Sequence, residues 1–149
     1  MLEIIAYTDG SCLGNPGVGG YAGIMLAKGQ ERVCVGYEPS QTTNNRMELR
    51  AAINVLKWIR RVQKEPCKVT FYTDSQYLVN CFKHTWSELT SVARPNNDLW
   101  VELIKESIDG QIGIEFIKVK GHDGIKMNER ADKLAKAQAI KARHEAFGR

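Results

Sequence analysis

Four carboxylates stand where separate elements of a fold could bring them to one place. Asp9 is expected to end a first strand and Asp74 a later one, while Glu48 lies in the first turn of a long helix and Asp132 near the start of a C-terminal helix. Ligands of open α/β sheets gather beyond the carboxyl ends of strands, so Asp9 and Asp74 are expected to meet in one crevice. Close carboxylates repel one another, and hard divalent cations relieve that repulsion. Two magnesium ions about 3.5–4 Å apart are the usual arrangement for phosphodiester cleavage, so the pattern predicts that chemistry.

Each acid also has an ordinary structural role open to it, in a turn, a helix cap or an exposed ion pair. The alternatives are a turn at Asp9-Gly10, a capping box between Asn45 and Glu48, a helix cap at Asp74 before Ser75, and an i,i+4 ion pair between Asp132 and Lys136. Taken singly, these alternatives are strong. The combination of the four acids with the residues around them favours a shared site.

A glycine-dense loop is expected over residues 14–20. Within it, Gly17-x-Gly19-x-x-Ala22 imitates a dinucleotide-binding fingerprint. That motif works only where the loop opens a helix, and this loop opens a predicted β-hairpin. The glycines therefore indicate a tight turn and a close approach of the backbone to a large ligand.

The elements that hold these groups follow from the hydrophobic pattern and the turn residues. Strands are predicted at residues 3–8, 21–26, 32–37, 68–73 and 114–119, and helices at residues 46–62 and 75–82, from Asn96–Asp98 onward and from Met127 onward. Three strands joined by hairpins, followed by strands joined through helices, predict an α/β fold with a mixed sheet and helices on its faces. Residues 1–149 are expected to form a single domain.

Composition excludes several classes of protein. With 149 residues, of which 43% are hydrophobic, the chain can bury one core, so disorder and repeat arrays are excluded. It has no apolar run long enough to cross a bilayer and no signal-peptide pattern at its start. Its four cysteines lack zinc-ligand spacing, which indicates reduced thiols in a cytoplasmic protein.

Charge is unevenly distributed along the chain. Residues 1–117 carry 12 Lys/Arg and 13 Asp/Glu, whereas residues 118–149 carry 9 Lys/Arg and 4 Asp/Glu. All of the excess positive charge therefore lies in the last 32 residues. A basic segment of this kind favours a polyanionic partner, nucleic acid first, although a solvated helix face would have the same composition.

The residues around the four acids resemble type-1 ribonuclease H in four ordered blocks. These blocks are Tyr7–Gly17, Thr42–Leu49, Tyr72–Tyr77, and Val119–His122 followed by Asn128–Asp132. They span residues 7 to 132, so the resemblance covers nearly the whole chain. It implies a five-stranded mixed sheet and an endonuclease that cuts the RNA strand of an RNA–DNA hybrid. It also implies that no separate hybrid-binding domain precedes Asp9, and that the protein is a monomer without a membrane partner.

The resemblance also implies roles for individual residues. Asp9, Glu48, Asp74 and Asp132 would hold two Mg²⁺ or Mn²⁺ ions, of which one activates the attacking water and the other stabilises the leaving 3′-oxygen. The products would carry a 5′-phosphate and a 3′-hydroxyl. His122, in a glycine-flanked loop, would move protons or assist product release, and its ordinary pKa near 6.5 suits that task.

Selectivity for a hybrid requires a reader of 2′-hydroxyls on one strand and of their absence on the other. The positions that match family residues lining the RNA minor groove are Cys12, Asn15, Asn44, Asn45 and Gln76. The positions that match contacts to the DNA strand are Thr43 and Asn96 for a phosphate and Trp86 for the sugars, with an ambiguity of one residue for Asn96 and for Trp86. Trp58 and Trp100 are assigned to packing.

The sequence departs from the family pattern at two places, and both departures change how the substrate is expected to be bound. Gln41 stands where the family often has a basic residue. The stretch His84–Pro95 is short and has no net charge, whereas many bacterial relatives carry a Lys/Arg-rich handle there. We therefore expect the basic C-terminal segment to contact phosphates in its place.

Two rival functions remain at this point. One is a different nuclease of the same fold, such as a proofreading exonuclease or an integrase, and the pair Asn44-Asn45 and the His122 loop argue against it. The other is a catalytically silent hybrid-binding module, which would require the loss of at least one acid.

Overall fold

A five-stranded mixed sheet forms the centre of the fold, as the sequence predicts. The computed structural model describes residues 1–148, without the side chains of residues 121–123. The strands are β1 (Leu2–Leu13), β2 (Gly17–Ala27), β3 (Gln30–Thr42), β4 (Cys67–Thr73) and β5 (Ile112–Lys118). Their order across the sheet is β3-β2-β1-β4-β5, with β1, β2 and β3 antiparallel and β1, β4 and β5 parallel.

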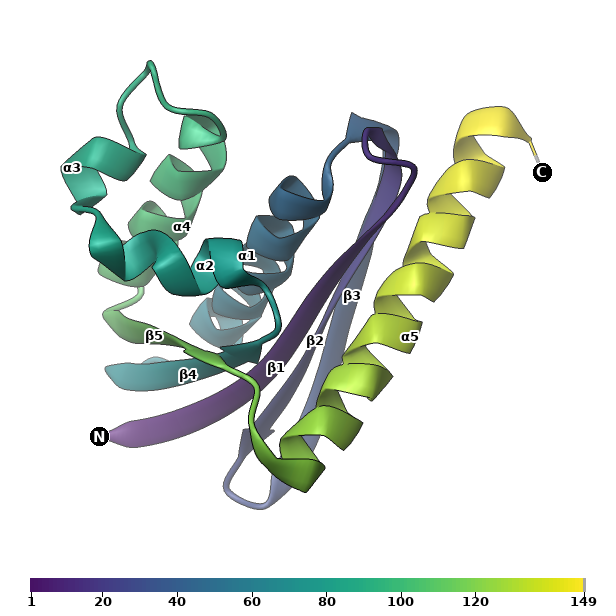
Figure 1. Ribbon diagram of the computed structural model, residues 1–149. Coiled ribbons are helices and arrows are strands. Elements are labelled where there is room, and N and C mark those ends of the chain that lie inside the picture. Colours follow the sequence, from purple (N-terminus) through teal and green to yellow (C-terminus); the bar gives the residue numbers. More distant parts are fainter. Residues whose placement is uncertain (149) are drawn as a thin grey trace.

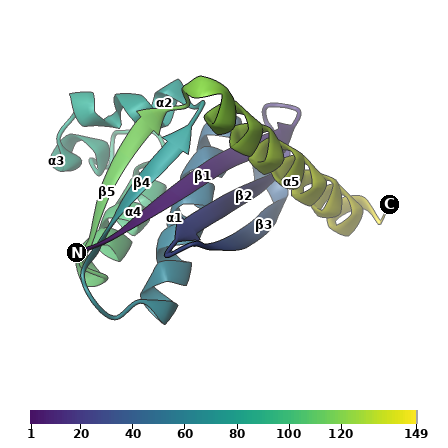
Figure 2. The ribbon, with the colours of Figure 1, turned by 90° about the horizontal axis from the view of Figure 1, so that it is seen from below.

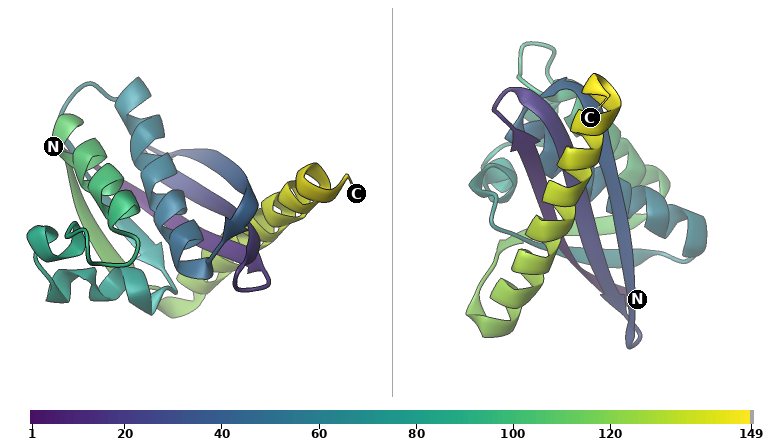
Figure 3. Two further views of the ribbon diagram at one scale, coloured as in Figure 1. Left: turned by 90° about the horizontal axis from the view of Figure 1, so that it is seen from above. Right: turned by 90° about the vertical axis from the view of Figure 1, so that its right-hand side faces the viewer.

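Helices cover both faces of this sheet (Figures 1 and 2). Helices α1 (Asn44–Val62) and α4 (Asn97–Asp109) lie side by side on one face, and α5 (Gly121–Phe147) crosses the other face over β1, β2 and β3 (Figure 3). Between β4 and α4 the chain forms α2 (Gln76–Val79), a 3₁₀ turn η1 (Asn80–Lys83) and α3 (Trp86–Leu89). None of the described helices is long and apolar enough to cross a membrane.

The main core lies between the sheet and α1. One face of α1 is buried through Leu49, Ile53, Leu56 and Ile59, because apolar residues recur there at helical spacing. Trp100 of α4 is 1% exposed, so its assignment to packing is confirmed. The core members that these residues meet include Val69, Phe71, Leu78, Leu103 and Phe116.

Small residues allow α5 to lie directly on the sheet. Its buried stripe consists of Ala131, Ala135, Ala139 and Ala142. A Cβ at Gly20 of β2 would collide with the Ala135 carbonyl oxygen and the Ala139 nitrogen, so only glycine fits there. This packing fixes where α5 passes the middle of β1 and β2.

The predicted start of the last helix at Met127 is wrong, because α5 begins at Gly121. The glycines before Met127 indicated a loop. Gly124, however, is buried inside the helix, where a Cβ would lie 3.3 Å from Cγ1 of Val119. Close packing, and not a turn, therefore accounts for Gly124.

The predicted end of the first strand at Asp9 is also wrong, because β1 continues through Asp9 and Gly10 to Leu13 and forms no turn there. Asp9 pairs with Ala22 of β2, and Ser11 pairs with Gly20. Gly10 is needed for another reason, since a Cβ there would lie 2.5 Å from the backbone nitrogen of Glu48. The glycine permits the start of α1 to approach β1, and this contact brings Glu48 to Asp9.

Candidate active site

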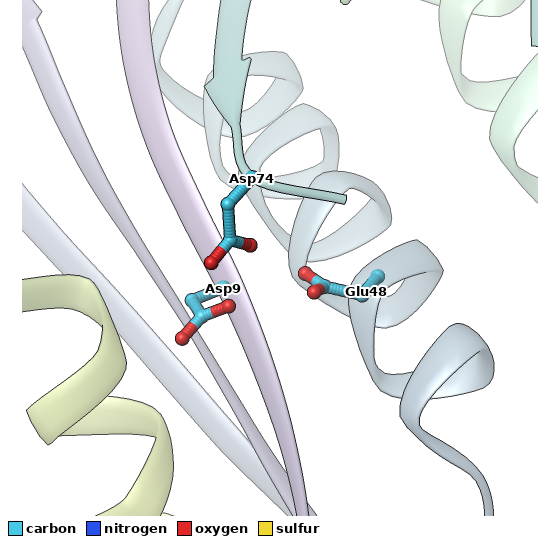
Figure 4. A group of neighbouring side chains, drawn as sticks. All are labelled: Asp9, Glu48 and Asp74. Atoms are coloured by element: carbon cyan, nitrogen blue, oxygen red, sulfur yellow. The ribbon is translucent and has the colours of Figure 1, made fainter. Parts of the chain in front are cut away.

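Three carboxylates from three elements meet at the middle of the sheet. Asp9 comes from β1, Glu48 from α1, and Asp74 from the residue that follows β4. One carboxylate oxygen of each lies within 4.8 Å of the others. Figure 4 shows the three side chains directed toward a common point. Asp9 and Glu48 are buried, and Asp74 is exposed, so the group opens to solvent on the Asp74 side.

The caps of α1 and α2 are formed by residues other than Glu48 and Asp74. Helix α1 is capped by Thr43, whose hydroxyl accepts a hydrogen bond from the backbone N–H of Arg46 at 3.3 Å, so Glu48 closes no capping box. Helix α2 is capped by Ser75, whose hydroxyl accepts from the N–H of Leu78 at 3.2 Å. The caps that were considered as alternatives for Glu48 with Asn45 and for Asp74 are therefore not formed.

Asp132 lies at the edge of this group and outside the set of three. Its carboxyl lies close enough to that of Asp9 to help raise the pKa of Asp9. It also pairs with the Lys136 ammonium one turn later, at 3.1 Å. The ion pair that was considered as an alternative to a site role thus exists together with this closeness to Asp9.

Burial and mutual repulsion hold protons on the two inner acids. The pKa of Asp9 is raised to about 8, first by burial and then by the charges of Asp74 and Asp132. The pKa of Glu48 is raised well above its usual value, first by burial and then by Asp9 and Asp74. The charges that act on these two acids are therefore those of other acids, and each opposes ionisation of its neighbours.

The unpaired oxygen of Glu48 fits a cation. Its Oε1 is buried and has no hydrogen-bond partner among the described residues. Oxygen donors from carboxylates are the ligands that Mg²⁺ takes, often through only one or two carboxylates together with substrate phosphates. A divalent cation among Asp9, Glu48 and Asp74 would supply the missing partner and remove the repulsion.

The raised pKa of Asp9 predicts how the metal-free protein responds to pH. The folded state keeps this proton up to about pH 8, whereas the unfolded chain loses it near pH 4. Stability contributed by this group is therefore lost as pH rises between these values. We expect the melting temperature in EDTA to fall between pH 5 and pH 8, with at least ~1 kcal/mol, or about 3 °C, arising from Asp9.

Thermal melts of the wild type and of Asp9→Asn over this pH range check the expectation. The variant carries no titrating group at this position, so its melting temperature is expected to depend less on pH. Equal slopes for the two proteins would show that Asp9 titrates normally.

Lys118 is a neighbour of the site that sequence reasoning missed. Its Nζ donates a hydrogen bond to the backbone carbonyl oxygen of Asp74 at 2.6 Å. The pairing of Thr73 with Lys118 in the parallel strands β4 and β5 makes this contact possible. The two residues are 44 positions apart, and no feature of the sequence signals their meeting.

Several residues predicted to contact the RNA strand lie at the end of β1, in the β1–β2 turn and at the start of α1. The backbone N–H of Asn44 donates to Oδ1 of Asn15 at 3.1 Å, which ties the β1–β2 turn to the start of α1. Cys12 is half-buried, and its thiol donates to the carbonyls of Gly17 and Thr42. Asn45 is exposed on the first turn of α1.

The remaining predicted contacts lie on the segment between β4 and α4. Gln76 begins α2, and its amide donates to Oδ1 of Asn80 at 2.8 Å. Trp86 begins α3 and is 38% exposed, with its ring centroid 6.1 Å from that of Phe82, so it is no core tryptophan. Asn96 precedes α4 and donates to the Tyr77 hydroxyl at 3.1 Å.

Two further predictions concern the periphery of the site. The side chain of His122 lies outside the part of the chain that the structure describes. Gln41 is exposed and lines a groove of about 490 Å³ together with Pro16 and, from the end of α5, Arg143 and Phe147. Arg143 of α5 therefore lies in the same groove as Gln41, the position where the family often has a basic residue.

Comparisons with known proteins agree with this fold and identify the family. The RNase H family model matches residues 2–140. A ribonuclease H of Symbiobacterium thermophilum is 43% identical over 146 aligned positions, covering 92% of this chain and 95% of that protein. A ribonuclease H of Helicobacter pylori is 45% identical over 144 positions, covering 95% of this chain and 96% of that protein.

Solved structures repeat the same architecture at lower identity. The crystal structure of LC11-RNase H1 in complex with an RNA/DNA hybrid aligns with a TM-score of 0.75 at 24% identity, covering 93% of this chain and 98% of that one. The N-terminal RNase H domain of a Mycobacterium tuberculosis protein aligns with a TM-score of 0.76 at 21% identity, covering 98% and 99%. These likenesses confirm the predicted fold class.

Proposed function

The chain belongs to the ribonuclease H family, and we propose that it is an endoribonuclease that hydrolyses the RNA strand of RNA–DNA hybrids at the site built on Asp9, Glu48 and Asp74. The observation that carries this function is the meeting of three acids from β1, α1 and the end of β4, with a buried oxygen of Glu48 left unpaired. We propose that residues 1–149 act as one catalytic domain and as a monomer, since the three acids come from one chain.

The acids would hold the metal ions of the reaction. Asp9, Glu48 and Asp74 offer one set of oxygen ligands, and Asp132 adds a further carboxylate beside Asp9. Two bound Mg²⁺, or Mn²⁺, would supply an activated water and charge stabilisation at the leaving oxygen. The products would be a 5′-phosphate and a 3′-hydroxyl.

The chain's own groups prepare this chemistry. Burial of Asp9 and Glu48 keeps their carboxylates in place and dry, so that charge interactions there are strong. The Lys118 ammonium holds the backbone at Asp74, which fixes the start of that side chain. We propose that His122 moves a proton at the leaving or attacking oxygen, because an imidazole changes charge near neutral pH.

The RNA strand would be recognised by side-chain amides, and the DNA strand by residues that bind one of its phosphates. Amide side chains both donate and accept hydrogen bonds, as a 2′-hydroxyl does, and we propose that Asn15, Asn44, Asn45 and Gln76 offer them to the RNA strand. We propose that Cys12 contacts the RNA strand as well. On the DNA side we propose Thr43 and Asn96 for a phosphate and Trp86 for the sugars.

A cleavage assay with three substrates tests the proposed function. With Mg²⁺, the protein is expected to cut the RNA strand of a hybrid and to leave duplex RNA and duplex DNA intact. Cleavage of duplex DNA would favour another nuclease of this fold. Binding of the hybrid without any cleavage, in Mg²⁺ or Mn²⁺, would favour a silent binding module.

We propose that the basic face of α5 adds phosphate contacts. Lys133, Lys136, Lys141 and Arg143 are exposed along it, while Arg149 lies outside the described residues. Deleting residues 140–149, the simplest test by sequence, would also remove the buried Ala142 and disturb packing. Substitution of the cations is therefore the better experiment.

We expect Lys141→Gln/Arg143→Gln to raise KM and to lower the salt dependence of binding, with turnover at saturation kept. Each phosphate that the variant no longer neutralises should reduce the slope of log affinity against log salt by about 0.9. Hybrid titrations at several salt concentrations measure this slope. An unchanged slope and KM in the folded variant would identify these residues as a solvated helix end.

The four cysteines are unpaired, which fits a reducing compartment, and we propose that the enzyme acts in the cytoplasm.

A further inference from the structure

Helices α1 and α4 lie side by side (Figure 3), and ion pairs join them at three levels. The pairs are Arg46–Asp98 at 2.8 Å, Glu102 with Arg50 at 3.3 Å and with Lys57 at 2.6 Å, and Arg60–Glu106 at 2.8 Å. The first level lies at the starts of both helices and the last near their ends. The first and the last level are both ion pairs between an arginine and a carboxylate, but the residues around them differ.

At the first level, Arg46 binds two partners at once. Its Nη1 and Nη2 donate to the two carboxylate oxygens of Asp98 at 2.9 and 2.8 Å, which is a bidentate pair. Its Nη1 also donates to Oδ1 of Asn96 at 3.3 Å. The guanidinium thus holds the residue before α4 as well as the first turn of α4.

The other end of the Asn96 amide is held by Tyr77. Nδ2 of Asn96 donates to the Tyr77 hydroxyl at 3.1 Å, and Nε1 of the buried Trp100 donates to the same oxygen at 2.9 Å. Both ends of the Asn96 amide therefore have partners, one from α1 and one from α2.

Asn96 has a backbone conformation that needs such support. Its φ is 64°, in the left-handed region that residues other than glycine adopt rarely, and its side chain does not cap α4. Residues in such conformations persist where their surroundings fix them. Here the fixing groups are Arg46 and Tyr77.

These groups are adjacent in sequence to the predicted substrate contacts. Arg46 follows Asn44 and Asn45, and Tyr77 follows Gln76. The hydrogen bonds of Asn96 therefore connect a residue predicted to contact the DNA strand with α1 and α2, which carry residues predicted to contact the RNA strand. Among the described residues, the ion pair Arg60–Glu106 makes no such link.

We propose that Arg46 and Tyr77 are positioning residues that hold Asn96 at a fixed place relative to Asn44, Asn45 and Gln76, so that the protein engages both strands of a hybrid in one arrangement. The inference rests on the proposed function. Arg46 acts here through Asp98 and Asn96, and its charge is directed at Asp98 and not at a phosphate.

The test compares Arg46→Met with Arg60→Met, which breaks the matched pair at the far end of the same two helices. Both variants lose an ion pair between α1 and α4, so similar losses of thermal stability are expected. Only Arg46→Met is expected to raise KM for a hybrid, by about tenfold, with kcat largely kept. Tyr77→Phe is expected to raise KM in the same way, and Arg46→Lys to restore part of the loss.

Two further measurements separate positioning from direct contact and from a purely structural role. Arg46→Met should leave the salt slope of hybrid binding unchanged, whereas removal of a phosphate-binding cation would lower it by about 0.9. Adding Asp98→Asn to Arg46→Met should raise KM no further, because each substitution by itself already breaks the Arg46–Asp98 ion pair. A lowered salt slope, or equal KM values for Arg46→Met and Arg60→Met in a wild type that cleaves hybrids, would overturn the inference.

Failure of the proposed function would look different. In that case the wild type itself would not cleave a hybrid. Titration of a labelled hybrid in EDTA would still compare the affinities of Arg46→Met and Arg60→Met, and equal affinities would reject the positioning role on their own.

Discussion

Asp9→Asn is expected to lower the rate of hybrid cleavage by at least about 1,000-fold while the fold stays intact. The substitution is nearly isosteric, but it removes the charge from the acid that faces both Asp74 and Asp132 and lies with Glu48 in the three-acid group. An amide at this place is a poorer metal ligand and cannot bridge two cations as a carboxylate can. Single-turnover cleavage at saturating Mg²⁺ measures the effect.

Stability provides the internal control for this variant. Since burial and neighbouring acids oppose ionisation of Asp9, its replacement by a neutral amide is expected to raise the melting temperature in EDTA at pH 8. Asp109→Asn, at the exposed end of α4, is the matched control and should alter neither rate nor stability appreciably. Cleavage by Asp9→Asn near the wild-type rate would reject the two-metal mechanism.

A DNA duplex in which one strand carries a short run of ribonucleotides is expected to be cut within that run, whereas duplex RNA is expected to resist cleavage. The predicted readers come from the β1–β2 turn, the start of α1 and the start of α2, so together they span several nucleotides. They should therefore need consecutive 2′-hydroxyls on one strand. The DNA-side contacts should reject a second ribose strand.

Substrates that differ in the length of their ribonucleotide run, beginning with a single ribonucleotide, measure the length that is required. We expect little cleavage at a single ribonucleotide and cleavage close to that of a full hybrid at the longer runs. Asn45→Ala should lengthen the run that is needed, and because Asn45 is exposed, the fold should tolerate the substitution. Comparable rates on duplex RNA and on the hybrid would show that Asn44, Asn45 and Gln76 are assigned wrongly.

The order and type of the main elements were predictable, because they depend on local patterns. Alternating apolar residues predicted the hairpin around Lys28 and Gly29, where both residues have positive φ. Helical spacing predicted α1, and the order of elements predicted the mixed sheet. The predicted boundaries of these elements were wrong near two glycines. Gly10 and Gly124 indicated a turn and a loop, yet each serves close packing between distant segments.

The candidate site was predictable in its residue types and only partly in its geometry. The acids and the ordered blocks around them predicted which residues form the candidate site, because the chemistry requires those residue types. Tertiary structure decided that Asp9 lies within β1, that Thr43 and Ser75 take the caps, and that Asp132 stands beside the three-acid group.

The sequence thus determined which acids this protein carries and which elements bear them, since a strand or helix is set by neighbours a few positions apart. Only the tertiary structure decided what those acids and their supports touch. Lys118 meets Asp74 across 44 positions, and Arg46 meets Asp98 across 52. Such contacts depend on the register of β4 with β5 and on the packing of α1 against α4, which no local pattern encodes.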